Sequence, residues 1–335
     1  MDMKTFKTQF DDLLKVYLEQ KIQTLHHYHG DKKLEQVIAY IVQFAQGGKR
    51  IRPYLVYIFY KACGGLDDEY AMHYGITNEM IHLYGLIHDD IADEWLIRHD
   101  IPTYHKHIEK IFADPYKGVS LAIRVGDLIH TRAMKHLIEM KADHRILSLY
   151  YDMLEEVTYG EIIDIYLSYS KEMRTSEMIE FKDKWKSWYY SFKRPMMIGA
   201  SLAGHKDLVH IETLGEILGL AFQMRDDLLD IIEIKPNKTI FSDHQEGNQT
   251  YILLHMLQKV TSDEKIFVEQ TRGKHMSTEE KKKLLSIYIR TGTIEYAKQQ
   301  INYLLDQATT QLKQIVGKEN DYHKYIQRII DFLRV

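Results

Sequence analysis

The stretch EMIHLYGLIHDDIADEWLIRHDIPT, from Glu79 to Thr103, decides the prediction of the fold. A largely apolar run leads into three carboxylates, Asp89, Asp90 and Asp93. If this run is a helix, Asp89 and Asp93 lie one turn apart on the same face. Like charges at that spacing repel by roughly 0.2–0.5 kcal/mol on an exposed helix. We therefore expect a divalent cation to neutralise this pair.

The same arrangement returns far downstream in FQMRDDLLD, which carries Asp226, Asp227 and Asp230. Mg²⁺ takes oxygen ligands and usually binds through one or two carboxylates together with substrate phosphates. One such triplet alone is more simply a solvated acidic face. Two copies, each preceded by apolar residues, favour two carboxylate sets that face each other across a helical cavity and hold Mg²⁺ around a diphosphate.

Composition narrows the class of protein. The chain has 335 residues, of which 45% are hydrophobic and 27% charged, as is usual for a globular protein. A net charge of -4 gives no argument for a nucleic-acid partner or a membrane surface. The single cysteine, Cys63, excludes an internal disulfide framework. No apolar run approaches the roughly 18 residues that span a bilayer, so we expect a cytoplasmic protein.

Helical periodicity recurs along the whole chain. Apolar residues repeat at steps of three and four in residues 6–18, 34–45 and 294–312, and only five prolines occur. Ser277 followed by Glu280 predicts a capping box that opens a helix. No alternating pattern of useful length indicates strands. We predict an all-α protein that forms a single domain over residues 1–335, with loops at Gln46–Pro53, Arg98–Thr103, Ile234–Thr250 and Gln270–Ser277.

A basic segment lies in the first of these loops. GGKRIRPYL, from Gly47 to Leu55, places Lys49, Arg50 and Arg52 beside two glycines. Glycine lets a ligand approach the backbone closely, arginine offers a planar fork for phosphate oxygens, and lysine adds a mobile charge. This segment alone fits a diphosphate site and a solvated basic helix cap about equally well.

Together these motifs resemble one family. GGKRIRP, then HDDIAD with RHDIPT, then VGD and FQMRDDLLD follow the order of the trans-polyprenyl diphosphate synthases, between about Gln43 and Tyr251. Farnesyl and geranylgeranyl diphosphate synthases belong to that family. The resemblance implies a helical bundle of the isoprenoid synthase type with a central substrate cavity, and a homodimer. It also implies Mg²⁺-assisted condensation of isopentenyl diphosphate with an allylic diphosphate.

The resemblance also implies residue roles. The catalytic residues would be Asp89, Asp93, Asp226 and Lys193. The principal metal ligands would be Asp89, Asp93 and Asp226, and the supporting ligands would be Asp90, Asp227 and Asp230. The allylic diphosphate would be held by Arg98, Lys193, Gln223 and Lys238. Isopentenyl diphosphate would be held by Gly48, Lys49, Arg52 and His82.

Some positions depart from the family pattern. His99 and Asp100 stand where a second arginine and a glycine are usual, and Asn248 replaces a lysine. Arg194 replaces the threonine after Lys193, and Glu161 replaces the glutamine at the second position of GEIID, where Asp164 is retained. His99 and Arg194 remain candidate phosphate contacts. These departures keep open a non-catalytic subunit of a heteromeric synthase, and a terpene cyclase on the same scaffold is a further alternative.

Two residues are predicted to determine the length of the product. Tyr84 and Gly85 lie five and four residues before Asp89, on the helix face below the carboxylates. A large aromatic there would act as a floor for a growing prenyl tail. The sequence therefore predicts farnesyl or geranylgeranyl diphosphate, and the space beside Gly85 favours the longer of the two.

Overall fold

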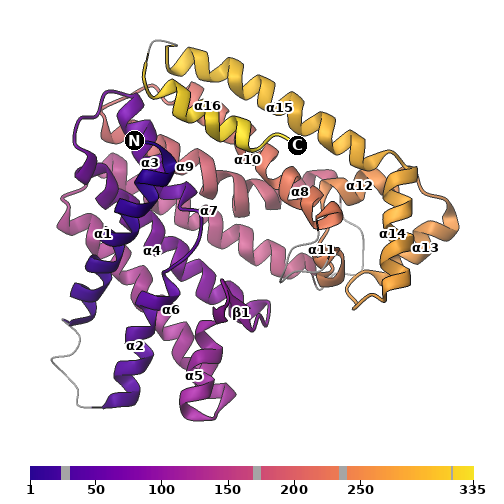
Figure 1. Ribbon diagram of the computed structural model, residues 1–335, viewed down its shortest axis with the longest axis horizontal. Helices are drawn as coiled ribbons and strands as arrows, with labels where there is room; N and C mark the ends of the chain where they lie inside the picture. Colours follow the sequence, from indigo (N-terminus) through magenta and orange to yellow (C-terminus); the bar gives the residue numbers. More distant parts are fainter. Residues whose placement is uncertain (24–30, 169–174, 234–239, 318–319) are drawn as a thin grey trace. The chain divides into compact units, whose positions relative to one another are not determined.

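The structure is a computed structural model that describes residues 1–23, 31–168, 175–233, 240–317 and 320–335 (Figure 1). It is helical almost throughout, which confirms the predicted all-α class. In the described ranges the only strands are the two-residue pair β1 (Ile97–Arg98) and β2 (Ile101–Pro102). No helix of the described residues is long and apolar enough to cross a membrane.

The chain divides into two compact units, Met1–Ser148 with Ile198–Gly204, and Leu149–Met197 with His205–Val335. The prediction of a single domain stays a prediction. Up to Ser148 the helices are α1 (Met3–Gln23), α2 (Lys32–Phe44), α3 (Ile51–Ala62), α4 (Asp68–Ala92), α5 (Tyr104–Phe112), α6 (Pro115–Glu139) and the start of α7 (His144–Ser168). Later come α8 (Ser176–Asp183), the π-helix η2 (Lys184–Lys193), α9 (Arg194–Leu202), α10 (Val209–Ile232), α11 (Ser242–Glu246), α12 (Tyr251–Leu257), α13 (Ser262–Thr271), α14 (Thr278–Arg290), α15 (Thr293–Ile315) and α16 (His323–Phe332).

The long helix α4 carries the first carboxylates and is the central element of the first unit. Asp67 caps its N-terminus by accepting from the Tyr70 amide, and Asp68 and Glu69 in the first turn complement the helix dipole. α4 packs along α6 and against α3 (Figure 1). Twelve of its residues are buried, on more than one face, so α4 is a core helix of this unit.

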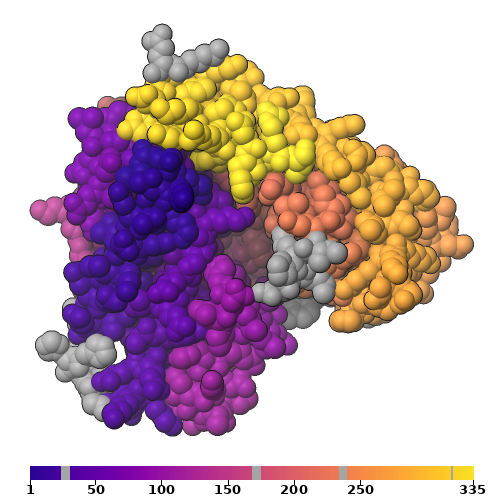
Figure 2. All heavy atoms as spheres, in the orientation of Figure 1, coloured from indigo at the N-terminus to yellow at the C-terminus, as the bar shows by residue number. Residues whose placement is uncertain are grey.

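Helix α10 carries the second carboxylates and holds the same place in the second unit. It packs against α15 on one side and against the π-helix η2 on another. Glycine makes the second contact close, because a Cβ at Gly219 would lie 2.4 Å from the Cβ of Trp188. A Cβ at Gly215 would likewise lie 2.5 Å from the Cα of Lys193. Helices α15 and α16, orange to yellow, lie at the surface in Figure 2.

The loop predictions fare unevenly. The capping box of Ser277 and Glu280 is confirmed at the start of α14. The predicted loop Arg98–Thr103 is wrong in part, because it contains the hairpin of β1 and β2. The predicted loop Ile234–Thr250 is also wrong in part, because it contains α11, and its residues 234–239 lie outside the described residues. These two errors concern elements of five residues or fewer, which leave little periodicity to read. The predicted loop Gln46–Pro53 also extends too far, because α3 begins at Ile51.

Candidate active site

The first carboxylate set lies at the C-terminal end of α4. Asp93 caps the helix, with its amide donating to the carbonyl of Asp89, and no basic residue lies in the last turn. Asp93 is exposed and Asp89 is partly exposed, whereas Asp90 is fully buried. The negative end of a helix dipole and neighbouring carboxylates disfavour this arrangement without a cation.

Asp90 has a partner within the protein. Its Oδ1 accepts from Nε and Nη2 of Arg98 at 2.7 and 2.6 Å. Burial raises the pKa of Asp90, and the Arg98 guanidinium opposes that rise. The structure thus separates the triplet into two accessible carboxylates, Asp89 and Asp93, and one that anchors Arg98.

The hairpin that carries Arg98 brings His99 to the glycine-rich loop. His99 and Asp100 form its two-residue turn with φ of 48° and 65°, the left-handed pair of a type I′ turn. The His99 ring lies against Gly47, where an added Cβ would be 3.2 Å from Nδ1. Burial and the nearby Arg98 and Arg50 lower the pKa of His99. His99 is therefore an uncharged donor or acceptor near neutral pH.

Two of the predicted contacts of isopentenyl diphosphate meet in the first unit. Nη1 of Arg52 lies 3.3 Å from Nε2 of His82, and the side chain of Lys49, three residues before Arg52, is exposed. The pKa of His82 is held well below its usual value by burial and by Arg52, Arg98 and Arg50. His82 thus lies near several arginine side chains, and arginine is a good donor to phosphate oxygens.

Tyr84 is enclosed by two histidines. Its ring centroid lies 4.7 Å from that of His88 and 5.1 Å from that of His130 on α6. Gly85 differs, because a Cβ added there would meet nothing within 4 Å. Open space therefore lies next to the residue predicted to limit product length.

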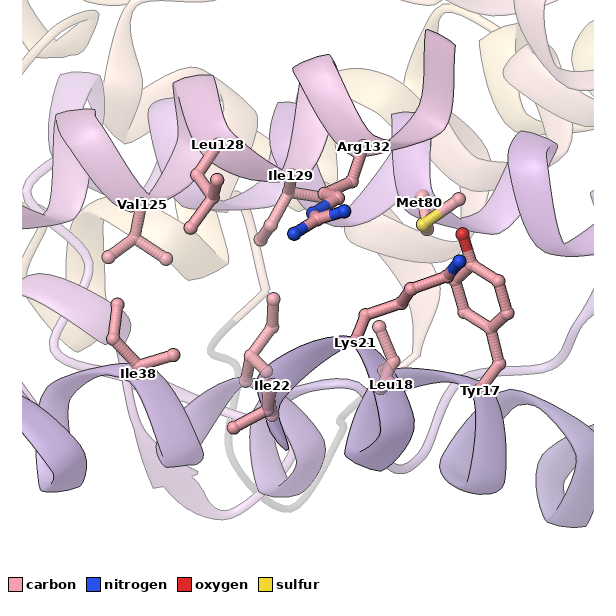
Figure 3. A pocket seen from close by; sticks show the side chains of 11 residues that line it. Tyr17, Leu18, Lys21, Ile22, Ile38, Met80, Val125, Leu128, Ile129 and Arg132 are labelled. Atoms are coloured by element: carbon pink, nitrogen blue, oxygen red, sulfur yellow. The ribbon is translucent and has the colours of Figure 1, made fainter. Parts of the chain in front are cut away.

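A separate pocket in the first unit lies between α1, α2, α4 and α6 (Figure 3). Aliphatic side chains line most of it, including Leu18, Ile22, Ile38 and Ile129. None of the predicted site residues lines this pocket, and it does not enter the proposed chemistry.

The second carboxylate set likewise contains both exposed and buried side chains. Asp226 is exposed, whereas Asp227 and Asp230 are buried. Asp227 accepts from Nε2 of Gln223 at 2.7 Å, and burial together with Asp243 and Asp183 raises its pKa well above the usual value.

Asp230 caps the short helix α11. Its carboxylate accepts from the amides of Ser242 at 3.2 Å and Asp243 at 3.1 Å, and from the hydroxyl of Ser242. Carboxylates at helix N-termini are stabilised by the unpaired amides there. Of this triplet, Asp226 is the exposed carboxylate.

Lys193 and Arg194 form ion pairs away from the second carboxylate set. Nζ of Lys193 pairs with Glu212 at 2.5 Å and Glu216 at 3.1 Å, and Arg194 pairs with Glu156 on α7. Glu216 precedes Asp226 by ten residues, which is about 15 Å along a helix. The structure therefore does not bring Lys193 to the end of α10. The remaining predicted contact, Lys238, lies outside the described residues.

Two lysines that the motif reading missed gather around Asp164 instead. Lys186 pairs with Asp164 at 2.5 Å and with Glu161 at 2.8 Å. Lys182 pairs with Asp164 at 3.2 Å and with Asp183 at 3.1 Å. Asp164 in GEIID was the sequence signal that could have indicated them, because a carboxylate withdrawn from water needs a cationic partner. Asp183 and Lys182 also act electrostatically on Asp227, which ties this cluster to the second carboxylate set.

The carboxylates fit a metal that substrate helps to hold. In the described ranges there is no cluster of three or more His, Cys, Asp or Glu side chains that could hold a metal ion. Mg²⁺ is commonly bound by one or two carboxylates, with waters and phosphate oxygens completing its octahedron. Asp89 with Asp93, and Asp226, are donor sets of this size.

Comparison with known proteins agrees with these features. Residues 31–288 match the family model "Polyprenyl synthetase". The chain is 31% identical to the short chain isoprenyl diphosphate synthase of Methanocaldococcus jannaschii over 304 residues, covering 88% of this chain and 84% of that protein. It is 25% identical to the geranylgeranyl diphosphate synthase of Sulfolobus acidocaldarius over 334 residues, covering 96% and 94%.

A solved structure extends the likeness to the fold. Geranylgeranyl pyrophosphate synthase from Corynebacterium glutamicum, complexed with isoprenyl diphosphate and magnesium, aligns with a TM-score of 0.86 and 25% identity, covering 99% of each chain. The fold is thus the helical bundle of the isoprenoid synthases. With its family model covering most of its length, the chain belongs to the polyprenyl synthetase family.

Proposed function

We propose that the protein is a trans-prenyltransferase that condenses isopentenyl diphosphate with an allylic diphosphate to give a short-chain prenyl diphosphate. One observation carries this proposal beyond family membership. A single helix, α4, presents His82 against Arg52 and ends in the accessible carboxylates Asp89 and Asp93. A cationic site for one anionic substrate and a metal-binding end for the other therefore share one rigid element.

The reaction couples bond cleavage to bond formation. The allylic C–O bond breaks, and diphosphate departs with the electron pair. The double bond of isopentenyl diphosphate attacks the allylic cation, a C–C bond forms, and a proton leaves to the departing diphosphate. Bound Mg²⁺ would supply Lewis-acid stabilisation of the charge that develops on the leaving group.

The protein's own residues bind and orient. Asp89, Asp93 and Asp226 would hold Mg²⁺, and Lys49 and Arg52 would grip isopentenyl diphosphate as a point charge and a fork. His82 keeps Arg52 in place without adding charge of its own, because its pKa is lowered.

The length of the product follows from Tyr84 and Gly85. The enclosed ring of Tyr84 supports its role as a floor, and the open space at Gly85 supports the longer product. We propose geranylgeranyl diphosphate, in agreement with the names of relatives such as the Sulfolobus acidocaldarius enzyme.

We also propose a homodimer. Large apolar side chains are exposed along one face of α7, with Tyr151 54%, Ile162 57% and Tyr166 64% exposed. Their spacing of eleven and four residues places them in one stripe. Exposed apolar patches of this kind mark protein interfaces, and a second copy of the chain is the partner that the family resemblance implies.

Substitution of the accessible carboxylates tests the reaction. Asp89→Asn and Asp226→Asn should each lower kcat by at least about 10², which corresponds to roughly 3 kcal/mol of transition-state stabilisation. Circular dichroism should show unchanged helix content, since both side chains reach solvent. Turnover at the wild-type rate in both variants would refute the proposed role of the metal.

A further inference from the structure

Arg50 lies between the two proposed substrate contacts Lys49 and Arg52, yet it is buried, with 6% of its surface exposed. Its Nε donates to Asp11 of α1 at 2.7 Å, and its Nη1 donates to Glu79 of α4 at 2.5 Å. Its Nη2 donates to the carbonyl of Ala45. The donors of its guanidinium are thus directed into the protein, to three different segments.

The backbone at Arg50 needs such support. Arg50 is the N-cap of α3 and has φ of 57°, in the left-handed region. A non-glycine residue in that region costs about 1–2 kcal/mol, so surrounding contacts must hold it. The carbonyl of Arg50 accepts from the amide of Tyr54, and this bond is the first helical hydrogen bond of α3. The side-chain contacts therefore fix the turn from the glycine loop into the helix.

The charges around Arg50 are matched as well. Glu79 is 3% exposed, and a buried carboxylate of this kind requires a partner. Burial lowers the pKa of Arg50, but Glu79 and Asp11 overcome that effect and the pKa is raised, so the guanidinium stays charged. Two carboxylates, those of Asp11 and Glu79, therefore pair with this one guanidinium.

We infer that Arg50 is a positioning residue for isopentenyl diphosphate: it ties the loop of residues 45–50 to α1 and α4, and so holds Lys49 and Arg52 in register for one diphosphate. This inference rests on the proposed binding of isopentenyl diphosphate by those two side chains. It assigns to Asp11 and Glu79, which are not among the predicted substrate contacts, a part in substrate affinity.

Steady-state kinetics of the full chain with Mg²⁺ and both substrates test the inference. Arg50→Met should raise KM for isopentenyl diphosphate tenfold or more and leave KM for the allylic diphosphate within twofold. Arg50→Lys keeps the charge but replaces three donor nitrogens by one, so the KM of this variant for isopentenyl diphosphate should lie between those of Arg50→Met and wild type. Arg290→Met removes an arginine from a surface pair with Glu264 and should change neither KM.

Asp11→Asn offers a milder change if Arg50→Met does not fold, because Asp11 is partly exposed and also pairs with Lys7. It should raise KM for isopentenyl diphosphate two- to fivefold. Equal rises in both KM values, or unchanged values in Arg50→Lys and Asp11→Asn, would overturn the inference.

Lys49→Ala separates the inference from the proposed function. If Lys49→Ala leaves KM for isopentenyl diphosphate unchanged, the proposed binding role of the loop is wrong, and the inference falls with it. If Lys49→Ala raises that KM and the Arg50 variants do not, the inference alone is wrong.

Discussion

The ion pairs of Asp164 should make the free energy of unfolding depend on pH. Its two lysine partners lower the pKa of Asp164 to about 2 although burial opposes them. Because the pKa in the folded state is below that in the unfolded state, the carboxylate stabilises the fold above pH 4 and loses this effect as pH falls toward 2. One pKa unit is about 1.4 kcal/mol, so Asp164→Asn should lower the free energy of unfolding by about 2 kcal/mol at pH 7.

Urea unfolding of wild type and Asp164→Asn at pH 7, 4 and 3 checks this value. The difference in unfolding free energy should fall to about half by pH 3, since the wild-type carboxylate then loses its advantage. Asp226→Asn is the matched control: its carboxylate is exposed, so its unfolding free energy should stay within about 0.5 kcal/mol of wild type. An equal loss in both variants, or a loss for Asp164→Asn that does not change with pH, would refute the reasoning.

Three further substitutions probe α4 and α10. Tyr84→Ala removes the ring that lies between two histidines and should lengthen the prenyl products, as measured by mass spectrometry. An unchanged product profile would refute the role of Tyr84 in limiting chain length. Gly85→Ala adds a methyl group in open space and should raise the free energy of unfolding by up to about 1 kcal/mol through helix propensity. Gly219→Ala gains the same propensity but places a Cβ 2.4 Å from that of Trp188. Overpacking costs about 1–3 kcal/mol, so calorimetry should show a net loss, and stabilisation would contradict the close contact.

Helical spacing predicted the first carboxylate segment correctly, since the aspartates of residues 89–93 do end a helix. The family resemblance, not the spacing, assigned Arg52 and His82 to one substrate, and the structure places their side chains 3.3 Å apart. Helical period and proline scarcity were sufficient for the all-α class. Spacing cannot show burial, however. Asp89 and Asp90 are adjacent in sequence, yet one reaches solvent and the other pairs with Arg98 inside the protein.

The second unit was harder to read because η2 is a π-helix. A π-helix has i→i+5 hydrogen bonds and more residues per turn than an α-helix, so α-helical spacing misplaces side chains within it. Lys193 matched the motif by its neighbours in sequence, but it pairs with Glu212 and Glu216. Lys186, seven residues earlier, lies beside Asp164. Long-range ion pairs decide this arrangement, and a single sequence does not reveal them.

Product analysis tests the central claim most directly. The purified protein would be incubated with Mg²⁺, isopentenyl diphosphate and each allylic diphosphate in turn, and the products would be identified by mass. The proposed reaction predicts elongated diphosphates that end at geranylgeranyl diphosphate. Hydrocarbon products would indicate a terpene cyclase, and turnover only with an added partner protein would indicate a subunit of a heteromeric synthase; either result would contradict the claim.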